Sequence, residues 1–366
     1  MADASLVPAT LPVLPGLADL ADWPEYALAH GLTDGLPVYP PTPDRVAALV
    51  AASGRPGDVV LGAIPPADRI ATVEAVAANA VMAGVTPEQF PVLLAAVDAI
   101  LDDAFNLRGV QTTTHGCAPI VVVAGPCVDR LGFATAESVF GASASHASMA
   151  VGRALRLVLW NLGGATPGEP VKEVVGHPGR LGLCFGELAD AAPWPTLAVA
   201  NDATPGRDAV TVFAGEAPQS VAFWGAHDDP TERLSRIADV MCALGNNNTH
   251  TMGQCLVALT PPEARHLAAA GLRRDDVQEI LFGLARRRLD VLRPPGPLRP
   301  DLAPEHFYDW WPEWIDQSRP DTLVPCVSSP ESVLVTVTGA DSIPWAAVFP
   351  GWGHLGGFAV TREVQW

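Results

Sequence analysis

The chain has 366 residues, with 22 Lys and Arg against 40 Asp and Glu, so its formal net charge is −18. Nucleic-acid binding depends on clustered cationic side chains, and this acidic balance argues against a nucleic-acid partner. Hydrophobic residues reach 49% and charged residues only 17%, which excludes intrinsic disorder over most of the chain and predicts a large buried core.

The N-terminal segment 1–26 does not resemble a secretory signal, because it lacks a basic start and contains several Pro and Asp residues. The most apolar stretches, 75–85 and 91–101, are too short to span a bilayer. The six cysteines are scattered and form no CxxC pair, which is typical of reduced thiols. We therefore expect a cytoplasmic protein without a membrane partner.

Segments with helical periodicity alternate with short β-branched runs along the chain. This alternation predicts an α/β fold, with mixed or mostly parallel sheets flanked by helices. The run at 119–123 is expected to be buried on both faces. We expect helices over 43–50, 70–82, 86–100, 146–162, 230–244, 262–270 and 274–285, and strands over 59–61, 119–123, 181–185, 210–213, 255–259 and 333–337.

A faint internal repeat accompanies this pattern. The segments that begin at His115 and His250 each place a histidine and a cysteine before a strand. The repeat predicts two similar α/β halves, residues 1–205 and 206–366, with a ligand cleft between them. The proline-rich stretch at 293–304 is the linker candidate. The low charged fraction indicates extensive burial, either in two such halves or in a homodimer.

The sequence contains no GxGxxG after a strand, P-loop, HExxH or GxSxG motif, so it carries no signature for NAD or ATP. Polar residues at the ends of apolar strands remain as the site candidates, because ligands bind there in open α/β sheets. Lyase or hydrolase chemistry on a small-molecule substrate is therefore favoured over nicotinamide-dependent redox chemistry.

The strongest candidate segment, 112–117, places three threonines, His115 and Cys117 directly before the buried strand. An imidazole transfers protons near neutral pH, and a thiolate acts as nucleophile or metal ligand. An ordinary threonine-rich turn is the alternative interpretation. We predict that His115 is an acid–base catalyst and that Thr114 binds substrate.

A second candidate segment runs from Lys172 to Glu187. His177 lies among glycines and prolines, which permit close approach of a ligand to the backbone but which also suit a plain turn. We predict Cys184 as a catalytic thiol and Glu187 as a catalytic carboxylate. Lys172 and His177 are predicted to bind substrate.

Charged and polar residues in otherwise apolar helices form a third group of candidates. Glu74 and Asn79 share one apolar helix, and a buried carboxylate needs either a partner or a functional role. Arg153, Arg156 and Lys172 stand near the candidate segments of an acidic chain. Such a locally basic pocket would suit a small anionic substrate. We predict that Glu74, Asn79 and Arg153 bind substrate.

Metal binding is a further hypothesis. Cys117, Cys184 and Cys255 each adjoin a predicted strand, and three thiolates can hold an iron–sulfur cluster. A transition metal bound by His115 together with cysteine ligands is the alternative. Inert burial of each cysteine is the simpler interpretation.

Many segments together resemble an uncharacterised bacterial family that is associated with UGSC-type (seleno)proteins. They cover most of the chain: 34–42, 45–46, 72–74, 79–84, 113–115, 152–157, 161–164, 167–169, 176–179, 262–268 and 275–277. The resemblance implies no particular reaction. It implies that the polar motifs of the family include Glu74, Asn79, His115, Arg153, Asn161, Lys172, His177, Cys184 and Glu187, and we count Asn161 with the substrate-binding candidates.

The chain departs from the pattern of this family at 141–148 and 217–219, as expected of a specialised paralogue recruited to a biosynthetic pathway. The leading hypothesis is an enzyme that acts on a small polar or anionic metabolite by lyase- or hydrolase-type chemistry. One alternative is a thiol redox or sulfur-transfer protein, which requires a thiol with a lowered pKa. The other alternative is a non-catalytic binding paralogue.

Overall fold

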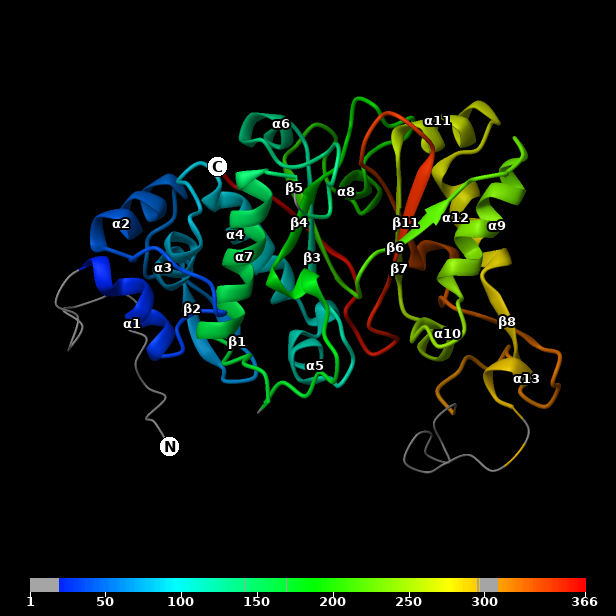
Figure 1. Ribbon diagram of the computed structural model, residues 1–366, viewed down its shortest axis with the longest axis horizontal. Helices are drawn as coiled ribbons and strands as arrows, with labels where there is room; N and C mark the ends of the chain where they lie inside the picture. The colour runs from blue at the N-terminus through cyan, green and yellow to red at the C-terminus, as the bar shows by residue number, and fades with distance from the viewer. Residues whose placement is uncertain (1–19, 142, 169, 295, 297–308) are drawn as a thin grey trace.

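The computed structural model describes residues 20–141, 143–168, 170–294, 296 and 309–366. Two four-stranded sheets lie face to face, and helices cover the outer face of each sheet (Figure 1). The predicted α/β fold, with mixed sheets flanked by helices, is confirmed. No helix in the described part of the chain is long and apolar enough to cross a membrane.

The first sheet has the strand order β12-β5-β3-β4. Strand β3 lies parallel to β4 and antiparallel to β5, and β5 is antiparallel to β12. The sheet is therefore mixed. Its strands are β3 (Ala118–Ala124), β4 (Leu183–Gly186), β5 (Ala209–Gly215) and β12 (Val360–Glu363).

The second sheet has the strand order β10-β7-β11-β6. Strand β7 lies parallel to β10 and antiparallel to β11, and β11 is antiparallel to β6. The sequence of pairings, parallel then twice antiparallel, is the same as in the first sheet. Its strands are β6 (Gln219–Ala222), β7 (Cys255–Leu259), β10 (Val333–Val337) and β11 (Trp345–Pro350).

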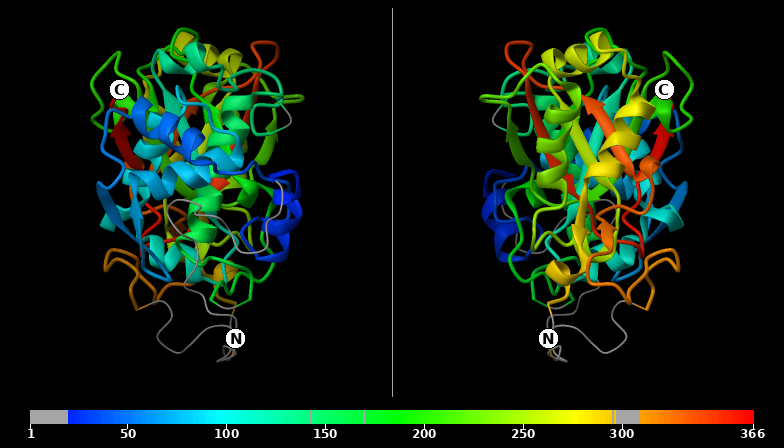
Figure 2. Two further views of the ribbon diagram at one scale, coloured as in Figure 1. Left: turned by 90° about the vertical axis from the view of Figure 1, so that its left-hand side faces the viewer. Right: turned by 90° about the vertical axis from the view of Figure 1, so that its right-hand side faces the viewer.

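Helices form the two outer layers, which the end-on views of Figure 2 show in turn. The first layer contains α2 (Pro43–Ala52), α3 (Val73–Ala83), α4 (Phe90–Ile100) and α7 (His146–Asn161), and the second contains α9 (Pro230–Met241), α11 (Pro261–Ala269) and α12 (Arg274–Leu284). The shorter helices are α1 (Trp23–Ala29), α5 (Leu107–Thr112), α6 (Cys127–Leu131), α8 (Leu197–Ala200), α10 (Asn248–Thr251) and α13 (Leu289–Leu292). Two small antiparallel pairs join β1 (Val60–Ile64) to β2 (Arg69–Thr72) and β8 (Arg286–Arg288) to β9 (Leu323–Pro325).

The core has three layers because successive residues of a strand point to opposite faces of its sheet. In β3, Val121 and Val123 pack with the first helical layer, whereas Ile120 and Val122 pack between the two sheets. The predicted burial of 119–123 on both faces is therefore confirmed.

The two sheets repeat one register. Val121 pairs with Val212 in the first sheet, and Val257 pairs with Val348 in the second, so each residue of the second pair lies 136 positions after its counterpart (257 − 121 and 348 − 212). The same offset relates the other pairs of β3 with β5 and of β7 with β11. The two halves are thus built on one strand pattern.

In each sheet the repeated pair of strands is followed by a strand that joins the other sheet. After β5 the chain crosses to the second sheet and forms β6, and after β11 it crosses back and forms β12. The boundary that we predicted between 205 and 206 does not separate the sheets, because β5 and β12 both follow it and lie in the first sheet. Most of the predicted linker at 293–304 lies outside the described residues.

Two predicted helices begin later than expected. The predicted helix at 70–82 starts at Val73, because Arg69–Thr72 pairs with β1 and the Thr72 hydroxyl caps the helix by accepting from the Ala75 N–H at 3.1 Å. The predicted helix at 86–100 starts at Phe90, where the Gln89 side chain accepts from the Thr86 N–H at 3.1 Å.

Candidate functional site

The strand register brings His115 and Glu216 together. His115 lies in the loop between α5 and β3, and Glu216 directly follows β5. Because β3 and β5 are antiparallel, with Ala118 opposite Gly215, the start of one strand lies beside the end of the other. The His115 Nε2 atom is 2.5 Å from the Glu216 Oε1 atom, and the two side chains are only 18% and 26% exposed.

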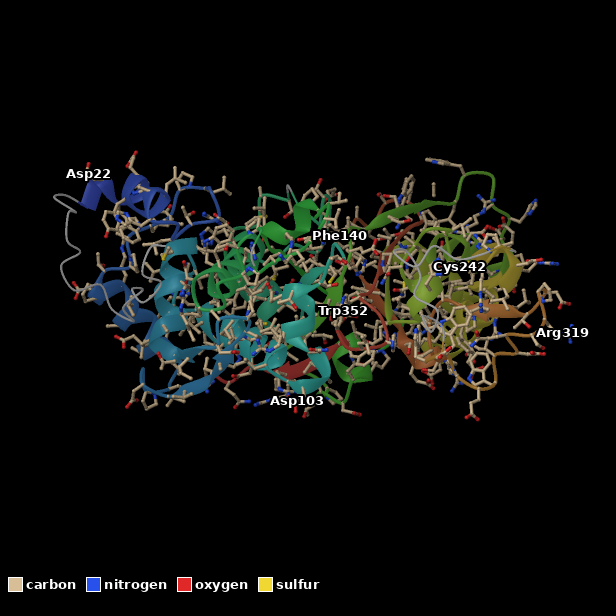
Figure 3. The ribbon with its side chains drawn as sticks, turned by 90° about the horizontal axis from the view of Figure 1, so that it is seen from below. Asp22, Asp103, Phe140, Cys242, Arg319 and Trp352 are labelled. Carbon is tan, nitrogen blue, oxygen red and sulfur yellow. The ribbon has the colours of Figure 1, made fainter. Side chains whose placement is uncertain are left out.

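The loop that carries His115 is held by Trp352, which follows β11 of the second sheet. The Thr113 hydroxyl accepts from the His115 backbone N–H and from the Trp352 indole N–H, each at 3.1 Å. Trp352 follows β11, as Glu216 follows β5, and it lies near the middle of the molecule seen from below (Figure 3). The His115–Glu216 pair therefore lies where the two halves exchange strands.

His177 is the third member of the site. Its Nδ1 atom accepts from the Gly179 N–H at 3.2 Å, at the start of a 3₁₀ turn over Pro178–Leu181, and its Nε2 atom is buried. Burial lowers the pKa of His177; the Gly215 carbonyl and the Glu216 carboxylate oppose this shift, and His115 adds to it. All of these groups therefore lie close to His177.

A buried ion pair closes one side of the site. The Arg180 Nε atom donates to the Glu173 carboxylate, and the two side chains are 14% and 7% exposed. A Cβ atom at Gly116 would lie 3.4 Å from the Glu173 Oε1 atom, so this glycine brings the His115 loop close to the ion pair. Thr114 is exposed, and its carbonyl accepts from the Val174 N–H at 3.1 Å, which ties the two segments together.

A cavity of about 510 Å³ opens beside this ion pair. Its charged and titratable lining consists of Arg156, Glu173, His177 and Arg180. Arg156 projects from α7, is 8% exposed, and has an Nη1 atom for which the described residues offer no hydrogen-bond acceptor. The predicted locally basic pocket thus exists, but its cations are Arg156 and Arg180.

Cys117 adjoins the site as an inert thiol. Burial raises its pKa to about 12, with Arg180 opposing and Glu216 reinforcing the shift. The thiol therefore stays protonated near neutral pH and is no nucleophile. Cys117 lies next to the charged groups because it directly precedes β3.

Cys184, which was predicted as a catalytic residue, does not lie with His115 and Glu216. It lies within β4, 3% exposed, in the core between the first sheet and its helices. A Cβ atom at Gly152 of α7 would lie 3.2 Å from the Cys184 Cβ atom, so the helix covers the thiol directly. Burial raises the pKa of Cys184 as well.

Glu187 was also predicted as a catalytic residue and lies at the opposite end of the sheet from His115. It follows β4 where the Glu187 N–H donates to the Val123 carbonyl, near the far end of β3. The seven residues of β3 span on the order of 20 Å. Both carboxylate oxygens accept from the Leu197 N–H at 2.8 Å, and burial raises the pKa of Glu187 to about 7 while Arg274 opposes the shift. Glu187 thus anchors α8 to the sheets.

Asn79 and Asn161 connect α3 to α7 away from the site. The Asn161 side-chain amide donates to the Asn79 Oδ1 atom at 2.8 Å and to the Leu32 carbonyl at 3.0 Å. Asn79 in turn donates to the Ala75 carbonyl at 2.9 Å. These bonds satisfy both amides, so the structure gives the two residues a packing role in place of the predicted substrate contact.

Arg153 and Glu74 also lie outside the candidate site. Arg153 donates to both oxygens of Asp34, at 3.0 and 2.8 Å, and to the Pro37 carbonyl at 2.9 Å. Burial would raise the pKa of Asp34, but Arg153 holds it below its ordinary value. Glu74 is half-buried in the first turn of α3, where a carboxylate favours the helix dipole. Lys172 is exposed beside the cavity residue Glu173.

The predicted metal ligands are not brought together. Within the part of the chain that the structure describes, no three His, Cys, Asp or Glu side chains are grouped so that they could hold a metal ion. Cys117 precedes β3, Cys184 lies in the middle of the neighbouring strand, and Cys255 begins β7 in the other sheet. The iron–sulfur hypothesis and the mixed site with His115 therefore fail on geometry.

Sequence reasoning identified His115 and His177 but missed Glu216, Glu173 and Arg180. The available signal for Glu216 was a charged residue three positions after the end of the predicted strand at 210–213, the same rule that selected the other candidates. Its pairing with His115 depends on antiparallel registration, which sequence periodicity does not contain.

No protein-family model, no curated protein and no solved structure matches this chain. Membership of the family that the sequence resembles therefore stays a prediction.

Proposed function

We propose that this protein is an enzyme that acts on a small anionic metabolite by acid–base chemistry of the lyase or hydrolase type. The observation that carries the proposal is the short contact between His115 Nε2 and Glu216 Oε1, with His177 beside it. His177 lines the cavity, and the His115–Glu216 pair lies next to it outside the cavity lining. Clustered titratable groups of this kind are typical of active sites.

The hydrogen bonds assign a different role to each imidazole. Glu216 accepts the proton on His115 Nε2, which leaves a lone pair on His115 Nδ1, a buried atom without a partner in the described residues. A carboxylate that orients a histidine in this way fixes its tautomer and strengthens it as a base. We therefore assign His115 Nδ1 as the general base.

His177 is the complementary donor. Its Nδ1 atom accepts from the Gly179 N–H, so the neutral ring carries its proton on Nε2. Burial favours the neutral ring by lowering its pKa. A base at His115 and a donor at His177 would remove a proton from one substrate atom and polarise another, as lyases and hydrolases require.

The thiol alternative loses its support. A redox or sulfur-transfer site needs an accessible thiolate, but all six cysteines are buried. Burial raises the pKa of each one.

A reaction screen tests the proposal. The purified protein is incubated in D₂O with small carboxylic acids that carry hydroxyl, oxo, amide, ester or alkene groups, and ¹H NMR follows proton exchange and product formation. We expect at least one compound to react, and we expect His115→Gln to slow that reaction by roughly 10²- to 10⁴-fold, the usual contribution of a general base.

His227→Gln is the matched control, because His227 is exposed in the second half of the chain. Unchanged turnover in His115→Gln would place the chemistry elsewhere. Saturable binding of a panel compound without any reaction would favour the non-catalytic paralogue instead.

A further inference from the structure

Arg156 is the most unusual charged side chain among the described residues. It is 8% exposed, lines the cavity with His177 and Arg180, and has an Nη1 atom without an acceptor in the described chain. Leaving a buried guanidinium donor unsatisfied costs free energy, and native proteins rarely retain such a donor without a use for it.

Among the described residues, the neighbours of Arg156 leave its charge uncompensated. Arg180 is neutralised by its ion pair with Glu173, and Asp34 is neutralised by Arg153. The Trp160 ring lies 4.9 Å from the Arg156 guanidinium carbon and supports the cation without neutralising it. The described lining residues therefore carry one net positive charge when His177 is neutral.

Arg156 remains a cation near neutral pH. Burial lowers its pKa to about 10, the charge of Arg180 adds to this shift, and Asp34 opposes it. The guanidinium thus offers a charged N–H donor to a ligand in the cavity. Such charge-assisted hydrogen bonds are stronger than neutral ones.

We propose that Arg156 binds a carboxylate group of the ligand, so that the substrate of the proposed reaction is a small carboxylic acid held between Arg156 and His177. One uncompensated positive charge matches a monoanionic carboxylate better than a phosphate dianion. That this ligand is a substrate rests on the proposed function. The binding site itself is inferred from the cavity and from Arg156 alone.

The proposal predicts opposite effects of one substitution on binding and on stability. Arg156→Met removes a buried, unneutralised charge and keeps an apolar stem of similar length. We expect this variant to unfold at no lower temperature than the wild type in the absence of ligand. A guanidinium that served only the fold would instead lower the unfolding temperature when it is removed.

Binding is measured with sodium acetate as the probe, and with sodium phosphate and sodium chloride at matched ionic strength. Calorimetry and thermal unfolding of the full chain give the apparent affinity. We expect saturable stabilisation by acetate in the wild type, and at least tenfold weaker binding in Arg156→Met. Arg265→Gln is the control and should bind acetate as the wild type does, since Arg265 is an exposed arginine that pairs with Asp341 and lies outside the cavity lining.

A second readout comes from His177. An anion at Arg156 lies in the cavity that His177 lines and favours the imidazolium, so acetate should raise the pKa of His177 in an NMR titration. The groups that face this ring are His115, Glu216 and the Gly215 carbonyl, together with Arg180 and Glu173 across the cavity. The signal is assigned from the spectrum of His177→Gln.

The outcomes are decisive. Equal effects of acetate and chloride, tighter binding of phosphate than of acetate, or unchanged acetate binding in Arg156→Met would each overturn the proposal. Acetate binding is measured without any reaction, so its result does not depend on the acid–base chemistry. Failure of the acid–base chemistry and failure of the carboxylate site therefore give different results.

Discussion

Gly215 and Gly351 pair with each other as an antiparallel bridge at the point where β5 and β11 leave their sheets. The two glycines occupy equivalent positions, 136 residues apart, in the two repeated strand patterns. Glu216 follows one glycine and Trp352 follows the other. The candidate site therefore lies where the two repeated strand pairs meet. Only the first of these pairs carries the acid–base pair His115–Glu216.

Side chains at this bridge should be tolerated poorly. A Cβ atom at Gly215 would lie 2.7 Å from Ile120 and from Phe213, and one at Gly351 would lie 3.1 Å from Phe213. We expect Gly215→Ala to lower the free energy of unfolding by about 1–3 kcal/mol, the usual cost of overpacking. Gly283 of α12 has open space around it, so Gly283→Ala should be neutral or slightly stabilising. Equal urea midpoints for the two variants would contradict this account of the crossover.

A buried ion pair stabilises the second half. Arg233 of α9 donates from Nε to the Glu263 carboxylate of α11 at 3.1 Å, and the two side chains are 8% and 0% exposed. Glu263→Ala leaves the Arg233 charge buried and unpaired, and we expect a loss of roughly 3–5 kcal/mol of unfolding free energy. Urea unfolding is the measurement. Asp341→Ala breaks an exposed pair with Arg265 and should change the midpoint little; similar losses in both variants would refute the argument from burial.

Acidification should destabilise the protein through His177. Burial lowers the pKa of His177 in the folded protein below the ordinary value of 6.5. Between that value and the folded pKa the unfolded chain binds more protons, so the unfolding free energy decreases as the pH falls below about 6.5. Urea titrations between about pH 8 and pH 5 should show a smaller decrease in His177→Gln than in the wild type. His250 and His354 shift in the same direction, so the difference between the two proteins, not the slope alone, isolates His177.

The cysteines should be unreactive in the native protein. All six are buried, and burial raises the pKa of Cys117 to about 12. We expect a disulfide reagent to label none of them within minutes at about pH 8 and to label all six after denaturation. One thiol that reacts fast in the native protein would reopen the thiol-transfer hypothesis.

The layered fold could be predicted from the sequence because its signals are local. The β-branched run of β3 and the helical periodicity of α7 and α9 are properties of short segments, and each element formed close to its predicted range. The exchange of β6 and β12 between the sheets could not be predicted. Both strands have four residues with partly exposed faces, and the register that places them is set by partners more than 100 residues away.

The candidate site could be predicted only in part. His115 and His177 stood out because each lies in a polar segment with glycines that precedes a predicted strand. Cys184 and Glu187 follow His177 closely in sequence, but β4 places Cys184 in the core and leads to Glu187 at the far end of the sheet. Glu216 was missed because its partner is 101 residues away and only the antiparallel pairing of β3 with β5 joins the two.

The central claim is that neutral His115 carries its proton on Nε2 and not on Nδ1. The most direct test of this claim needs no substrate. Imidazole ¹⁵N NMR of labelled protein, at about pH 8 where an ordinary histidine is neutral, reports which nitrogen of His115 is protonated. The account predicts a proton on Nε2 and a bare Nδ1 in the wild type, and loss of this preference in Glu216→Ala. A proton on His115 Nδ1 in the wild type, or the same tautomer with and without the Glu216 carboxylate, would contradict it.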